Sequence, residues 1–172
     1  MWLKEHLLRC LRHKYHDTNT SITAHDRNMV SFVNNRIFKH KVICINYTTY
    51  DLRRAQDSLN SRTHADFMTL SYDDNSCQLA RGRLPYRFGR ILGIFHAMVL
   101  YSGPGSQSLE PQLMEFLFVR WFGHDVHSHG SWKARRLHRI GFVDGDDDAA
   151  FGFLDPQEVI RGVHLIPAFH YG

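Results

Sequence analysis

The sequence predicts an α+β protein in which a pair of N-terminal helices precedes a small, bent β-sheet or barrel. Three observations predict this fold class. Apolar residues recur at helical spacing before Lys41, β-branched and aromatic residues dominate after it, and glycines interrupt the apolar runs beyond Tyr86. Glycine inside a strand marks a bend or a close approach of two backbones, which a small barrel requires.

The first helix is predicted from Trp2 to Tyr15, where apolar residues form one stripe and basic residues occupy much of the remainder. A second helix is predicted from Thr23 to about Phe38, because Thr23 and Asp26 have the spacing of a capping box. Residues 1–40 are therefore expected to form a helical arm.

The rest of the chain is predicted to be β structure with polar connections. The segment 51–64 is polar and is expected to connect two strands rather than form one. We divide the chain into the helical arm at 1–40, a strand with a polar connector at 41–80, and a small β-barrel-like domain at 81–172. Strands are expected at 42–50, 67–70, 88–101, 113–122 and 139–143, and within 159–166.

Composition indicates a folded domain with a real core, because 43% of the 172 residues are hydrophobic and 13% are aromatic. No apolar run is long enough to predict a transmembrane helix, and the charged N-terminus is not typical of a signal peptide. Cys10, Cys44 and Cys77 are widely spaced, which favours free thiols in a reducing compartment. We therefore expect an intracellular protein of the nucleus or cytoplasm that is neither secreted nor bound to a membrane.

The formal net charge of +4 is distributed unevenly along the chain. Residues 1–66 hold eleven Lys and Arg against six Asp and Glu, whereas residues 67–172 hold ten against eleven. This asymmetry indicates an arm that faces a polyanion, and the alternative is an ordinary solvated helix face.

Several phrases of the sequence match one family in order along nearly the whole chain. They resemble the Plavaka-type transposases, a fungal lineage of the CACTA-like DNA transposons. The phrases are NYTTYDLRR at 46–54, QDS at 56–58, RTH at 62–64, GRILGIFH at 89–96, FVRWFG at 118–123, RIGFV at 139–143, AFGFLDP at 150–156 and VIRGVHLIPAF at 159–169.

The resemblance implies that this chain is the non-catalytic C-terminal part of such a transposase, since the DDE carboxylates of these elements lie upstream. We expect a fragment of a larger reading frame, or a decayed or independently expressed copy of it. The layout after residue 67 also resembles the small β domain at the end of plant CACTA-like transposases, and is loosely similar to bromo-adjacent-homology modules. The sequence departs from the family at Arg87 and Phe88, where an aromatic pair is usual after Pro85-Tyr86.

Candidate catalytic and metal-binding residues are few. His124, His127 and His129 crowd one short segment, but no cysteine lies near to complete a zinc site. The acidic run at 144–148 lacks the spacing of a calcium loop and is expected to be a solvated turn. No cysteine has a partner at metal spacing, and no phosphate-binding loop or nucleophile motif occurs. We therefore predict no cofactor, no metal and no independent enzyme activity, so metal-dependent nuclease or transposase chemistry is not expected.

Basic residues are the candidates for nucleic-acid binding, because Lys and Arg neutralise phosphates and release counterions. We predict weak, non-specific DNA binding, and the alternative for each cluster is a solvated surface. The candidate binding residues are Arg9, Arg12 and Lys14 on the first helix, Arg53 and Arg54 in the connector, and Lys133, Arg135 and Arg136 before the 139–143 strand.

A second function hypothesis is a protein-interaction or chromatin-reading module, whose partners are other transposase domains or chromatin proteins. Trp121 and Phe122, together with Tyr86 and Phe88, have the chemistry of a cage for a methylated lysine. Aromatics at strand spacing more commonly belong to a core, and we expect Phe118, Trp121 and Phe142 to share one.

Overall fold

Antiparallel strands dominate the computed structural model, which describes residues 3–14, 22–71, 85–103, 106, 110–125 and 135–168. The protein is therefore an α+β protein rich in sheet, as the sequence predicts. None of the helices in these ranges is both long enough and apolar enough to cross a membrane.

The two N-terminal helices are shorter than the arm predicted for them. Helix α1 spans Leu3–Lys14 and buries its apolar stripe, as its periodicity predicts. Helix α2 spans only Ala24–Asn28. Its capping box is confirmed, since the Thr23 backbone donates to Asp26 Oδ2 at 2.8 Å and Thr23 Oγ1 accepts from the Asp26 backbone at 3.3 Å.

The prediction that the second helix continues to Phe38 is wrong. After α2 the chain forms strand β1 at Val30–Phe32, a 3₁₀ turn at Val33–Asn35 and strand β2 at Phe38–His40. Asn34 and Asn35 have φ angles of 54° and 52°, a left-handed conformation that a continuous right-handed helix through these residues could not contain. Both strands pair with β6, so tertiary pairing decides the conformation here.

Two long strands form the centre of the sheet. Strand β6 spans Tyr86–Tyr101, and β7 spans Gln112–His124. They pair from Gly89 opposite Trp121 to Val99 opposite Gln112, with a bulge between Ile91 and Gly93. The strands of the main sheet lie in the order β10-β5-β6-β7-β8, and β9 pairs with β7 beside this path. Their ranges are Asp66–Leu70 for β5, Ile140–Phe142 for β8, Phe151–Leu154 for β9 and Val159–Gly162 for β10. A 3₁₀ turn at Pro156–Glu158 connects β9 to β10.

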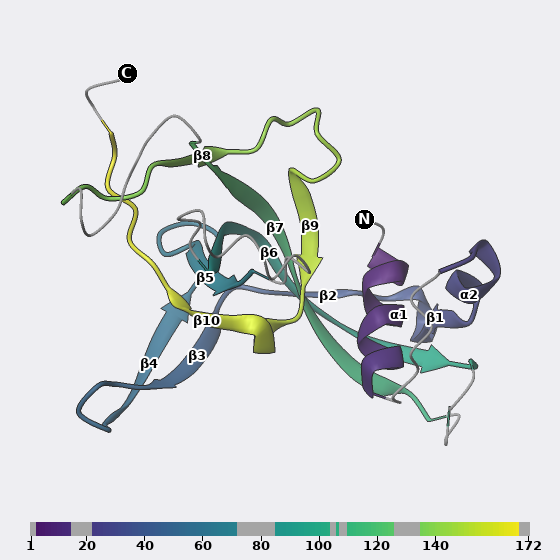
Figure 1. Cartoon of the computed structure of the whole chain (residues 1–172). Coiled ribbons are helices and arrows are strands. Elements are labelled where there is room, and N and C mark those ends of the chain that lie inside the picture. The colour runs from purple at the N-terminus through teal and green to yellow at the C-terminus, as the bar shows by residue number, and fades with distance from the viewer. Residues whose placement is uncertain are drawn as a thin grey trace.

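The sheet is strongly twisted but is not a closed barrel, so the barrel expectation is wrong. Among the described strands, β10 and β8 end the sheet without pairing to each other. Figure 1 shows β6 and β7 crossing the molecule together, with α1 at one end and the β3–β4 hairpin at the other.

The polar segment predicted to be a connector contains a strand instead. Strand β3 spans Ile43–Thr48 and pairs with β4 at Arg54–Leu59 in a separate two-stranded sheet. Side chains of β4 are alternately exposed and more deeply buried, and Leu59 is its fully buried residue. In Figure 1 this hairpin projects away from the main sheet.

The molecule has two hydrophobic cores, which lie on opposite faces of β7. Phe116 and Leu117 are consecutive and both are completely buried, which a strand allows only if each of its faces is covered at that point. The hairpin core contains Ile45, Leu59, Phe67, Ile91, Ile94, Leu117, Val119, Trp121, Leu154 and Val159. The helix core contains Leu7, Leu8, Leu11, Val30, Ala97, Val99, Tyr101 and Phe116.

The prediction that the chain beyond residue 80 is mainly strand is confirmed for the described residues. The prediction that Phe118, Trp121 and Phe142 share one core is wrong. Trp121 is buried in the hairpin core. Phe118 contacts Phe151 and Phe153 on the other face, and Phe142 is 38% exposed. Since side chains alternate along a strand, Phe118 and Trp121 face opposite sides of β7.

Candidate nucleic-acid interface

The tip of the β3–β4 hairpin has a defined backbone structure. The Leu52 backbone donates to Thr49 O at 3.0 Å, and the Thr49 backbone donates to Arg53 O at 2.8 Å. Leu52 has a φ of 61°, in the left-handed region where a three-residue hairpin loop commonly places glycine. The Thr49 hydroxyl also donates to Arg53 O at 2.9 Å, which closes the turn from the side chain.

This hydrogen-bonded tip presents apolar side chains to solvent. Tyr50 is fully exposed and Leu52 is 85% exposed. Leucine rarely adopts a positive φ, and its apolar side chain is usually buried, so Leu52 is unusual in both respects. Positions with such local strain concentrate at functional sites.

The hairpin is anchored to β10 by the side chain of Asp57. Asp57 Oδ2 accepts a 2.9 Å hydrogen bond from the Gly162 backbone and lies 3.7 Å from Arg161 Nε. The Arg161 guanidinium lies 4.3 Å from the centre of the Tyr47 ring and donates to the Tyr47 hydroxyl at 3.2 Å. These contacts hold the hairpin against the sheet and engage the Asp57 carboxylate.

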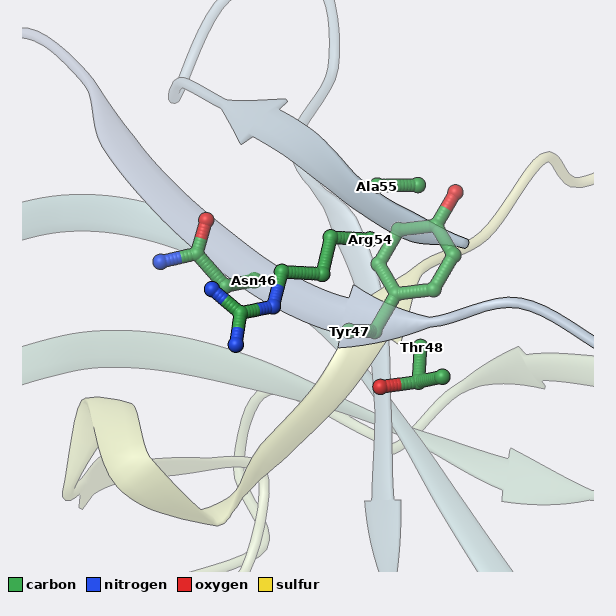
Figure 2. Close-up of a pocket in the computed structure, with 5 residues that line it drawn as sticks. All are labelled: Asn46, Tyr47, Thr48, Arg54 and Ala55. Atoms are coloured by element: carbon green, nitrogen blue, oxygen red, sulfur yellow. The ribbon is translucent and has the colours of Figure 1, made fainter. Parts of the chain in front are cut away.

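The two predicted arginines of the hairpin are in different states. Arg53 forms a 2.9 Å ion pair with Asp51, which engages the other carboxylate of the hairpin. Arg54 is exposed and has no ion pair with a described residue. It lines an open hollow of 390 Å³ with Asn46, Tyr47, Thr48 and Ala55 (Figure 2).

Polar side chains supply hydrogen-bond donors to this hollow, although most of its lining is apolar. Figure 2 shows Arg54 and Asn46 close together beside β3, with the Tyr47 ring next to Ala55. Asn46 Oδ1 accepts a 2.8 Å bond from Gln56 Nε2, which leaves the amide nitrogen of Asn46 as a donor. A guanidinium, an amide nitrogen and the Thr48 hydroxyl suit an anionic oxygen-rich ligand such as phosphate.

Two further cations flank the base of the hairpin and were missed by the sequence analysis. Lys41 precedes β3 by two residues and Arg62 follows β4 by three, and both are exposed. Neither forms an ion pair with a described residue. The signal that identifies them is the strand pairing itself, because Ile43 pairs with Leu59 and brings the two flanking segments together.

The basic patch predicted on the first helix is largely neutralised. Arg9 forms a 3.1 Å ion pair with Glu5. Arg12 is only 5% exposed and lies 3.1 Å from Asp26, so it joins α1 to α2 instead of facing solvent. Lys14 ends α1, and its side chain lies outside the described residues.

The third predicted cluster is described only in part. Lys133 lies outside the described residues. Arg135 and Arg136 are both exposed, and Arg135 has a left-handed φ of 50°.

A cysteine–histidine pair that the sequence analysis overlooked lies on α1. Cys10 Sγ is 3.7 Å from His6 Nε2, because residues four apart share a helix face. Burial, followed by the nearby carboxylates of Asp155 and Glu158, raises the pKa of Cys10 to about 12. Burial lowers the pKa of His6 to about 4. The pair is therefore neutral near pH 7, unlike an activated thiolate nucleophile.

No group of three His, Cys, Asp or Glu side chains is placed to hold a metal ion in the part of the chain that the structure describes. His124 is described and exposed, whereas His127 and His129 lie outside the described residues. The acidic run forms the turn that was expected, in which Asp147 Oδ1 accepts from the Ala149 backbone at 2.8 Å.

The aromatic residues considered for a methyl-lysine cage do not form one cage. Trp121 is buried, with the Arg87 guanidinium 3.8 Å from its ring centre and Phe67 against its edge. Phe122 lies on the other face of β7, stacked on Phe142 at 4.3 Å. Comparison of the chain with protein-family models, with curated proteins and with solved structures found no match.

Proposed function

We propose that this chain is a non-catalytic accessory domain of a transposase-derived protein, and that its β3–β4 hairpin binds the DNA backbone weakly. The observation that carries the DNA-binding proposal is a charge imbalance along the hairpin. Lys41, Arg54 and Arg62 are exposed and make no ion pair with described residues. Both carboxylates between them, Asp51 and Asp57, are already engaged.

The shape of the hairpin suits contact with a phosphate backbone. Its paired strands of six residues extend for about 20 Å. Lys41 and Arg62 lie at one end of this length and Arg54 near the other, so they reach separate phosphates. Contacts of this kind supply affinity without reading base sequence, and they weaken as salt competes.

The transposase origin rests on the sequence phrases that resemble Plavaka-type elements, three of which lie between residues 46 and 64. A DNA-binding accessory domain of this kind acts in the nucleus. Genomic context tests the proposal: we expect a reading frame for a DDE catalytic domain directly upstream, between terminal inverted repeats. An unrelated upstream gene without such repeats would contradict it.

The hairpin is tested by measuring binding to two unrelated DNA duplexes from about 50 to 200 mM salt. We expect similar, salt-sensitive binding to both duplexes. The variant Lys41→Ala/Arg54→Ala should bind more weakly and reduce the salt slope by about two. The matched control is Arg9→Ala/Arg27→Ala, which removes the same charge from residues that already lie near Glu5.

An equal loss in the control would show that overall charge, and not the hairpin, determines affinity. Absence of binding at low salt would favour the second candidate, a protein-interaction module. The observation that favours this candidate is the exposed pair of apolar side chains, Tyr50 and Leu52, on the hydrogen-bonded turn at the hairpin tip.

A further inference from the structure

A row of aromatic rings runs along one face of the sheet, starting beneath α1. Phe116 and Phe153 have ring centres 5.9 Å apart, and Phe153 lies 5.4 Å from Phe118. Phe118 then stacks on Phe151 at 6.1 Å, with 18° between the ring planes. The rings come from two paired strands, because Phe118 lies opposite Phe153 in the register of β7 and β9.

An arginine continues this row toward β8. The Arg120 guanidinium lies 5.6 Å from the Phe151 ring centre and 4.2 Å from that of Phe142. Phe142 in turn stacks on Phe122 at 4.3 Å, with 17° between the planes. We call Phe122, Phe142, Phe151 and Arg120 the outer platform.

The two ends of the row differ in exposure. At the helix end, Phe116 is completely buried among residues of the helix core. On the outer platform, Phe142 is 38% exposed and Phe151 is 37% exposed. The platform therefore offers flat aromatic surface to solvent.

The platform also carries a positive charge that no described carboxylate neutralises. Arg120 forms no ion pair with a described residue, and its Nε is buried without a hydrogen-bond partner. The neighbouring Arg90, 5.2 Å from the Phe142 ring centre, forms two hydrogen bonds with Asp66 at 2.7 and 2.9 Å. The Asp66 carboxylate thus neutralises the charge of Arg90, whereas no described carboxylate neutralises that of Arg120.

We propose that the outer platform binds the unpaired bases of single-stranded nucleic acid. Every base has a π face that stacks on an aromatic ring, and an unneutralised guanidinium attracts the adjacent phosphate. A DNA duplex already stacks its base faces inside the helix, so it cannot use this surface in the same way. The platform is therefore a separate site from the hairpin, with a different form of nucleic acid as its ligand.

The charge of the platform argues against a methylated lysine as the ligand. Arg120 already places a cation against Phe142, and Arg90 places a second one near Phe122. A further cation would meet repulsion from Arg120, whose charge no described carboxylate neutralises, whereas an anionic strand would be attracted.

The test is fluorescence anisotropy with a labelled single strand of about twelve thymidines and with a mixed-sequence duplex of the same length. We expect tighter binding of the single strand. Phe142→Leu and, separately, Phe151→Leu keep an apolar side chain but remove the ring, and should weaken single-strand binding about 5- to 100-fold. Duplex binding should remain as in the unmodified protein.

The matched control is Phe38→Leu on β2, which removes another exposed ring, one that stacks on His96 instead of on the platform. This variant should bind the single strand normally, and circular dichroism should show that all three variants are folded. Equal binding of single strand and duplex, or unchanged binding by both platform variants, would refute the proposal. So would an equal loss in the control. The hairpin variant Lys41→Ala/Arg54→Ala is tested on duplex DNA, whereas the platform variants are tested on the single strand. Either proposal can therefore be refuted while the other stands.

Discussion

At the scale of single residues, the ionisable groups of α1 act on folding. His6 is buried, and its ring centre lies 6.2 Å from that of Phe153 in the helix core. Its pKa falls from 6.5 to about 4, mainly through burial, with Arg9 also lowering it and Asp155 opposing the change. The folded protein therefore holds this imidazole neutral at pH values where an unfolded chain would protonate it.

Stability should fall as pH decreases from about 6.5 to about 4, because the unfolded chain binds a proton at His6 that the folded protein excludes. The loss from this group is up to about 3 kcal/mol, and it levels off below the folded pKa. His6→Gln should flatten this part of the pH profile in urea unfolding experiments. The exposed His25→Gln is the control, and an unchanged profile in His6→Gln would contradict the assignment.

Arg12, which the sequence predicts to bind DNA, is buried and has a structural role instead. Its guanidinium joins α1 to α2 through Asp26, which also caps α2. A buried ion pair is costly to break, because the remaining partner is left desolvated. Arg12 therefore belongs with the helix packing and not with the proposed DNA interface.

At the scale of elements, glycine determines how closely β6 packs against its neighbours. A Cβ atom on Gly89 would lie 2.7 Å from Phe67 Cζ and 3.1 Å from Trp121 Cε3. Phe67 is completely buried, so its ring has little room to move. Gly89 thus permits the two aromatic side chains of the hairpin core to meet edge to face across the strand.

Gly89→Ala should destabilise the protein by about 1 to 3 kcal/mol, because the added methyl group overpacks this core. The matched control is Gly141→Ala in β8, where an added Cβ meets no atom within 4 Å. Denaturant unfolding measures both variants. Similar unfolding free energies for the two would show that the space around Gly89 is adaptable.

At the scale of the whole molecule, β6 and β7 connect the two cores. Both strands contribute buried residues to the hairpin core and to the helix core, with Leu117 and Phe116 as neighbours on β7. Unfolding of one core removes a covered face from strands that the other core needs. We therefore expect the two cores to unfold as one cooperative unit.

Leu8→Ala in the helix core tests this coupling through a reporter in the other core. In a Trp2→Phe/Trp132→Phe background, Trp121 reports on the hairpin core. The variant should lose about 2 to 5 kcal/mol, and the Trp121 fluorescence transition should shift to lower temperature. Leu113→Ala, at an exposed position of β7, should shift it little. An unshifted Trp121 transition in Leu8→Ala would show that the cores unfold independently.

The sequence alone determined the elements that local patterns specify. The apolar stripe of α1, the capping box of Thr23 and Asp26, and the long strands around Gly93 and Phe116 are visible as spacing and composition. The sequence also pointed to Arg53 and Arg54, since adjacent arginines in a polar segment are conspicuous without a structure.

Tertiary structure alone decided what pairs with what, because the partners are far apart in the chain. Strand β4 forms by pairing with β3, and β1 and β2 form by pairing with β6 where a helix was predicted. Arg12 and Asp26 are brought together by the packing of α1 on α2, which removes a predicted DNA contact. The open sheet likewise depends on long-range packing: helix and hairpin cover opposite faces at opposite ends, and this leaves the outer platform exposed.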